Sequence, residues 1–102
     1  MISRQQLAEA VAQALSGKWG EAHKIVQRDE QDELACWIHA VLHRQEGDLP
    51  NARYWYARCG RRLRKGLVVE DELREIRAAL DEGRFGDFRR RFTADRERGI
   101  GE

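Results

Sequence analysis

Residues 37–61 read WIHAVLHRQEGDLPNARYWYARCGR and contain two of the chain's three tryptophans, two of its three histidines and both of its tyrosines. Gly47 and Asp48 divide this stretch into two segments of helix-like composition. The first interpretation is therefore an antiparallel helical hairpin that turns at this pair. The alternative is that the aromatic and imidazole side chains form a site that binds a ligand.

The hairpin interpretation predicts specific contacts, because residues equally far from the turn should face each other. His39 would then touch Tyr56, whose hydroxyl would satisfy the half-buried imidazole. Cys36 and Cys59 would be buried neighbours, with Cβ atoms within about 7 Å but not necessarily bonded. Ala52 is small, so we expect it at the closest approach of the two helices.

The glycine at the turn belongs to a pattern that occurs three times. The segments GKWGEAHKIV, GDLPNARYWY and GRFGDFRRRF align without gaps from Gly17, Gly47 and Gly83, which are 30 and 36 residues apart. A period in this range is typical of helical repeats. Each glycine follows a helix-like segment, where a left-handed C-terminal cap favours a residue without Cβ.

The segments between the glycines carry helix-start signals. Ser3 and Gln6 form a capping-box pair, Asp32 is suited to an N-cap, and residues 70–72 are an acidic run that favours a helix N-terminus. We predict one all-α domain over residues 1–102, made of three antiparallel hairpins with a frayed tail after about residue 95. The hairpins span about 3–29, 32–59 and 70–95, with helices at 3–16, 18–29, 32–46, 49–59, 70–82 and 86–95.

The repeated segment resembles the second half of the tetratricopeptide repeat. The matching positions are Gly47, Asp48, Leu49, Ala52, Tyr56 and Cys59 in the second unit, and Gly17, Trp19, Ala22 and Val26 in the first. In the third unit Phe88 stands where the family has a small residue, and the first halves lack the family's Trp and Leu signature. The resemblance implies a short stack of hairpins with a concave groove. The block from Trp37 to Arg61 is also similar to a group of short bacterial proteins of unassigned function.

Four side chains are left as candidates for lining such a groove. They are Trp37, Arg44, Trp55 and Arg58, and tryptophan and arginine are the residues most enriched at binding hot spots. The first functional hypothesis is therefore a non-enzymatic module, without a cofactor, that binds a protein or peptide. The apolar end faces of a three-hairpin stack could also be covered by a second copy of the chain, as a homodimer.

The second hypothesis is a metal site. His39 and His43 lie four residues apart on one helix face, Glu46 follows three residues later, and His23 could supply a third imidazole from the preceding helix. Such a site would define a small metal-binding protein or metal-dependent enzyme. The first histidine lacks the following glutamate of a metalloprotease motif, and packing explains the same residues.

Charge suggests a third hypothesis, RNA binding. Residues 1–50 carry 5 basic and 8 acidic side chains, whereas residues 51–102 carry 14 basic and 10 acidic ones. The basic residues concentrate at Arg58–Lys65 and Arg89–Arg91. The pI near 7.9 is low for an obligate nucleic-acid binder.

Other features exclude common alternatives. The N-terminal residues show no signal peptide or membrane span, so two cysteines are expected to be reduced thiols in the cytoplasm. No Gly-rich phosphate loop or Gly-x-Ser-x-Gly elbow occurs, so the sequence offers few candidate residues for acyl or phosphoryl transfer.

Overall fold

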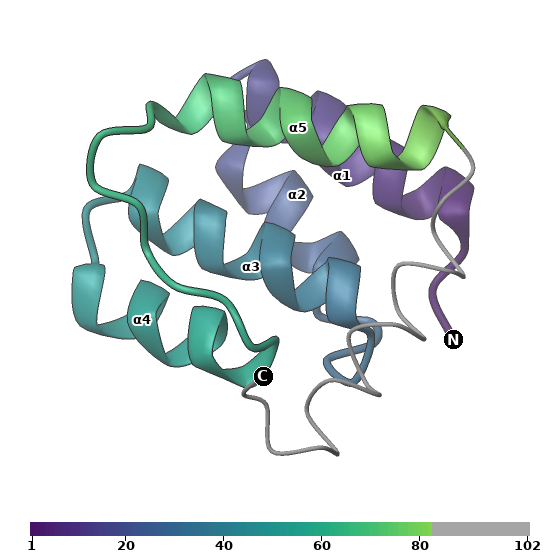
Figure 1. Ribbon diagram of the computed structural model, residues 1–102. Coiled ribbons are helices and arrows are strands. Elements are labelled where there is room, and N and C mark those ends of the chain that lie inside the picture. The colour runs from purple at the N-terminus through teal and green to yellow at the C-terminus, as the bar shows by residue number, and fades with distance from the viewer. Residues whose placement is uncertain (83–102) are drawn as a thin grey trace.

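The computed structural model describes residues 1–82, which form five α-helices and no strand (Figure 1). Within this range the predicted all-α class is confirmed, and each predicted helix agrees with an observed one to within three residues. The predicted helix at 86–95, and with it the third hairpin, lies outside the described residues. No helix in residues 1–82 is long and apolar enough to cross a membrane. The helices are α1 (Arg4–Leu15), α2 (Trp19–Val26), α3 (Glu33–Gln45), α4 (Leu49–Arg58) and α5 (Val69–Asp81).

The helix starts follow the local sequence signals. The Ser3 hydroxyl accepts from the Gln6 backbone N–H, and the Gln6 side chain accepts from the Ser3 N–H, which is the predicted capping box. The Asp32 carboxylate accepts from the Ala35 N–H at 2.9 Å at the start of α3. These donors have no partner inside their helices, so the caps fix where α1 and α3 begin.

The helix ends depend on glycine in the left-handed region. Gly17 has φ of 79° and Gly47 has φ of 89°. After each glycine the next N–H donates back to the carbonyl five residues earlier, from Lys18 to Gln13 and from Asp48 to His43, both at 2.9 Å. This is the Schellman arrangement, so the predicted glycine caps are confirmed at both positions.

The five helices form two hairpins and one crossing helix. Helix α1 packs against α2, α3 packs against α4, and α5 lies across both α1 and α3 (Figure 1). The Arg4 guanidinium donates to the Leu80 carbonyl, which ties α5 directly to α1. In a linear repeat array each unit contacts only its neighbours, so this contact between the first and third units departs from a simple stack. The relation to tetratricopeptide repeats stays a prediction.

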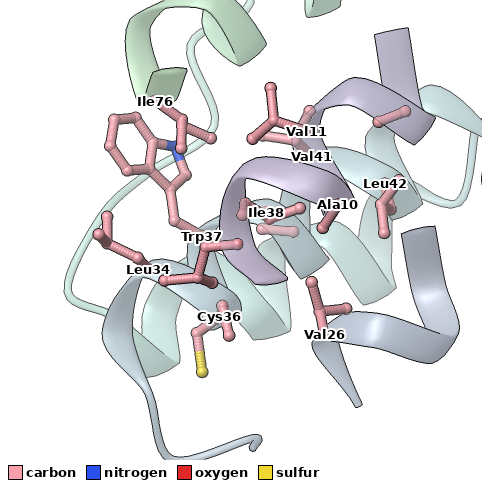
Figure 2. Packing of buried hydrophobic residues seen from close by; sticks show 14 of the residues in the cluster. Ala10, Val11, Val26, Leu34, Cys36, Trp37, Ile38, Val41, Leu42 and Ile76 are labelled. Carbon is pink, nitrogen blue, oxygen red and sulfur yellow. The ribbon is translucent and has the colours of Figure 1, made fainter. Parts of the chain in front are cut away.

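Helix α3 is the centre of the core. Every residue from Leu34 to His43 is buried, so this helix is surrounded on all sides. Figure 2 shows Trp37 of α3 beside Ile76 of α5, and Val41 of α3 beside Val11 of α1. Side chains on α3 are therefore packed on several sides.

Both cysteines are buried free thiols, as predicted. Burial raises the pKa of Cys36 and raises that of Cys59 to about 12. The Cys36 thiol donates to the Glu30 carbonyl and the Cys59 thiol to the Tyr56 carbonyl, and the predicted separation of their Cβ atoms stays a prediction. Both are expected to react slowly with thiol reagents.

Ala52 provides a test of the packing between α3 and α4. It is fully buried, whereas Ala57 on the same helix is exposed. Ala52→Leu is expected to lower the free energy of unfolding by about 1–3 kcal/mol, because the larger side chain overpacks the contact. The measurement is urea denaturation followed by circular dichroism, with Ala57→Leu as the matched control. Equal effects of the two substitutions would contradict the packing described here.

Candidate metal centre

All three histidines of the chain meet in one cluster. His23 comes from α2, and His39 and His43 come from α3. One ring nitrogen of each lies within 4.8 Å of the other two. The shortest approach is 3.1 Å, between Nε2 of His23 and Nε2 of His39. The structure thus brings together the three histidines that the sequence offered as metal ligands.

Helix geometry explains this convergence. His39 and His43 are four residues apart on α3, and their rings stack with centroids 5.0 Å apart. His23 projects from α2, with its ring centroid 4.7 Å from that of His39 and 5.4 Å from that of His43. The cluster therefore joins two helices that are separated by a turn.

Two tryptophans hold the first two imidazoles in place. The Trp19 indole stacks on His23 with centroids 4.5 Å apart, and its Nε1 donates to the Leu42 carbonyl at 2.6 Å. Trp55 of α4 stacks on His39 at 3.9 Å, with the rings only 14° from parallel. The indoles limit rotation of both imidazoles, as expected of groups that position a binding site.

Glu46 holds the third imidazole. Its Oε2 lies 2.7 Å from Nδ1 of His43. A carboxylate on one ring nitrogen fixes the tautomer and leaves the other nitrogen, Nε2, available to a metal ion. The sequence offered Glu46 as a fourth candidate ligand of the metal. In the structure its carboxylate contacts Nδ1 of His43, where it can orient the ring.

Two of the three imidazoles, those of His23 and His39, have lowered pKa values. Burial, followed by the charges of His23 and His43, lowers the pKa of His39 to about 3. Burial, followed by the charge of His43, also lowers the pKa of His23. The His39 ring is therefore neutral near neutral pH, which is the form that binds metals. Its Nδ1 is buried without a hydrogen-bond partner in the part of the chain that the structure describes.

The spacing of the His23 and His39 nitrogens is close to that around a tetrahedral ion. Zinc–nitrogen bonds of about 2.0–2.1 Å at tetrahedral angles separate the ligand nitrogens by about 3.3 Å. The 3.1 Å between His23 and His39 is close to this value. The third nitrogen, within 4.8 Å, would need to approach by a modest ring movement. Three imidazoles would leave a fourth position for water or a ligand.

The four candidate groove residues separate into two pairs. Trp37 is 3% exposed, and its Nε1 donates to Oε2 of Glu72 at 2.8 Å. Arg44 Nη1 donates to Oε1 of the same carboxylate at 2.9 Å. Trp55 is half-buried, with the exposed Arg58 guanidinium 5.1 Å from its ring centroid. The structure brings Trp55 and Arg58 together, but it places Trp37 and Arg44 inside the fold.

The predicted hydrogen bond between the Tyr56 hydroxyl and the His39 ring is wrong. The Tyr56 hydroxyl donates to the Glu72 carboxylate, with oxygen–oxygen distances of 2.8 and 2.9 Å. Burial and this hydrogen bond both raise the pKa of Tyr56. The partner of His39 across the hairpin is Trp55, one position earlier.

Glu72 is the residue that sequence reasoning missed. It is 1% exposed and accepts from Trp37, Arg44 and Tyr56. The sequence placed it in an acidic run at a helix start. Its burial could have been predicted from its position four residues before Ile76, because this spacing puts both residues on the same face of α5.

The basic stretch Arg58–Lys65 follows α4. The Arg61 guanidinium lies 3.5 Å from the Trp37 ring centroid, and Arg64 pairs with Glu75 at 2.6 Å. Arg62 and Lys65 are exposed. The second basic run, Arg89–Arg91, lies outside the described residues.

Comparisons with known proteins give only partial matches. No family model and no solved structure matches the chain. The queuine tRNA-ribosyltransferase of Paracidovorax citrulli is 48% identical over 50 residues, which cover 42% of this chain and 13% of that protein. The queuine tRNA-ribosyltransferase of Polaromonas naphthalenivorans is 61% identical over 28 residues, covering 28% and 7%. The match thus involves about an eighth or less of the length of these relatives.

Proposed function

We propose that this protein binds one divalent transition-metal ion, with zinc as the first candidate, through His23, His39 and His43. Glu46 orients His43, and the indoles of Trp19 and Trp55 hold the other two rings. The observation that carries the proposal is the convergence of one nitrogen from each of the three histidines to within 4.8 Å. Imidazole nitrogen is a preferred ligand of zinc, copper and nickel.

The histidine cluster carries a cost in stability that a purely packing role does not explain. Burying a polar nitrogen without a partner costs about 1–3 kcal/mol, and His39 Nδ1 has none among the described residues. Apolar side chains of similar size would fill the same space without that cost. A cation would use the lone pairs of the converging ring nitrogens, which for His23 and His39 are the Nε2 atoms, and polar groups buried at a cost to stability are typical of functional sites.

Binding of a protein or peptide ranks second. Two of its four candidate residues, Trp37 and Arg44, already bind Glu72. Trp55 and Arg58 remain near the surface, and Trp55 also supports His39. The relatives named queuine tRNA-ribosyltransferase share too small a part of their length for their activity to enter the proposal.

Metal titration tests this function. Isothermal titration with Zn²⁺ is expected to give one site per chain, and Co²⁺ is expected to give the visible absorption of a tetrahedral complex. His23→Gln should weaken binding by at least about 100-fold, because it removes a direct ligand from a three-ligand site. Glu46→Gln should weaken it by about 10–100-fold, the usual effect of losing an orienting carboxylate.

The matched control is Glu21→Gln, an exposed carboxylate on α2 near His23 in sequence. It should leave the affinity unchanged. Wild-type affinity no tighter than that of His23→Gln would overturn the proposed function.

A further inference from the structure

The histidine cluster supplies three ligand atoms and no fourth. His23, His39 and His43 each contribute one nitrogen, and within residues 1–82 no further histidine, cysteine or carboxylate joins the group whose ligand atoms lie within 4.8 Å of one another. Glu46 is close, but its Oε2 contacts Nδ1 of His43. Zinc sites that only support a fold are usually closed by four protein ligands, whereas catalytic sites keep one position for water or substrate. The number of ligands is therefore that of a catalytic zinc site.

The chemical type of the three ligands has a second consequence. Metal ions bind the neutral form of imidazole, so three histidines would leave the double positive charge of zinc without an anionic ligand. A zinc ion in such a set lowers the pKa of its bound water to about 7. Part of this water is then hydroxide near neutral pH. The open position would thus hold a nucleophile.

Burial restricts the approach to this position. His39 is 3% exposed and His43 is 6% exposed, whereas His23 is only half-buried. Trp19 stacks on His23 with ring centroids 4.5 Å apart, and Trp55 stacks on His39 at 3.9 Å. Solvent therefore reaches the cluster mainly beside His23, along an approach that the Trp19 indole borders. Such an approach favours a small substrate.

Charge around His23 favours a neutral substrate. Burial lowers the pKa of His23, and the charges of Glu46 and Glu30 oppose this effect. Both carboxylates are exposed, so they lie on the side from which a substrate arrives. The Arg58 guanidinium is placed against Trp55, 5.1 Å from its ring centroid. A phosphate ester would be repelled by the two carboxylates beside His23, whereas an uncharged ester would not.

We propose that the zinc-loaded protein hydrolyses small, uncharged carboxylic esters, with metal-bound hydroxide as the nucleophile. This inference rests on the proposed function, because the hydroxide requires the ion. The hydroxide oxygen bonds to the carbonyl carbon, and the bond from this carbon to the alcohol oxygen breaks, so that the leaving group departs with the electron pair. The acid product loses its proton to the solvent and leaves as a carboxylate. A water molecule replaces it on the ion and loses a proton to the solvent, which restores the hydroxide.

The first test asks whether the fourth position is open. Azide is added to the full chain loaded with one equivalent of Co²⁺, and the visible absorption spectrum is followed. Azide should replace the bound water and change the spectrum until the site is saturated. A spectrum that azide does not change would overturn the inference, because the position would then be closed by the protein.

The second test measures hydrolysis of p-nitrophenyl acetate by the full chain, with and without one equivalent of zinc. The zinc that the chain retains is determined after gel filtration. The zinc form should have a kcat/KM at least about tenfold above that of the metal-free chain, because a lone imidazole lacks the metal-bound nucleophile. His39→Leu should lose the zinc-dependent rate. Glu21→Gln, which changes an exposed carboxylate on α2, should keep it.

A second substrate, bis(p-nitrophenyl) phosphate, carries a negative charge and should react more slowly than the acetate. Faster hydrolysis of this diester would overturn the assignment of the substrate. A chain that retains zinc but hydrolyses the acetate no faster than the metal-free chain would overturn this inference alone, and the proposed function would stand. A chain that retains no zinc would overturn both.

Discussion

Replacing Glu72 by alanine is expected to lower the free energy of unfolding by about 3–5 kcal/mol, the usual cost of removing one partner from a buried ion pair. Glu72 accepts from Arg44 at 2.9 Å, from Trp37 at 2.8 Å and from Tyr56 at 2.8 Å. The Arg44 side chain is only 11% exposed, so its charge would remain inside the protein with the Leu67 carbonyl as an acceptor but without its carboxylate partner. The measurement is urea denaturation followed by circular dichroism and tryptophan fluorescence.

Glu75→Ala is the matched control, because Glu75 lies on the same helix and also pairs with an arginine. That pair is 46% and 48% exposed, so its loss should cost no more than about 1 kcal/mol. Glu72→Gln should lower the free energy of unfolding by an amount between those of Glu72→Ala and Glu75→Ala, since it keeps an acceptor oxygen but loses the charge. A Glu72→Ala effect no larger than that of Glu75→Ala would show that the buried carboxylate does not hold the fold together.

The second large effect is expected from zinc itself. At a free concentration about 1,000 times the dissociation constant, zinc should raise the free energy of unfolding by about 4 kcal/mol, since the ion binds the folded state. His39→Leu should abolish this increment. In the absence of metal the same variant should differ little in stability from wild type, because loss of the His23–His39 contact offsets the removal of a buried nitrogen that has no partner among the described residues.

Cys36→Ala serves as the control, because a thiol is the other strong zinc ligand in this chain. Its stability without metal should fall, since it creates a small cavity, but the increment from zinc should persist. If His39→Leu destabilised the metal-free protein by several kcal/mol and zinc stabilised neither form, His39 would be a packing residue and the metal proposal would fail.

The fold could be predicted from the sequence wherever local chemistry decides it. The capping box at Ser3, the cap at Asp32 and the left-handed glycines at positions 17 and 47 all involve residues within five positions of one another. Helix boundaries follow from such contacts, and they were predicted to within three residues. The placement of α5 across α1 depends on packing between distant segments, which no local pattern encodes.

The candidate site also has one feature that local sequence decides and one that depends on packing between helices. The spacing of His39 and His43 places them on one face of α3, and this was read from the sequence. The orientation of the aromatic residues of α4 was not predicted correctly from the sequence. Symmetric pairing about the turn predicted Tyr56 beside His39, but the helix is rotated by one position, so that Trp55 stacks on His39 and Tyr56 reaches Glu72. One residue on a helix is a rotation of about 100°, enough to exchange one contact for another.

The most direct test of the histidine site is X-ray absorption spectroscopy at the zinc edge of the full chain loaded with one equivalent of zinc. The proposal predicts three imidazole nitrogens at about 2.0–2.1 Å with one further light-atom ligand, and the loss of this pattern in His39→Leu. A sulfur shell near about 2.3 Å, or a spectrum of hydrated zinc with no imidazole contribution, would contradict it.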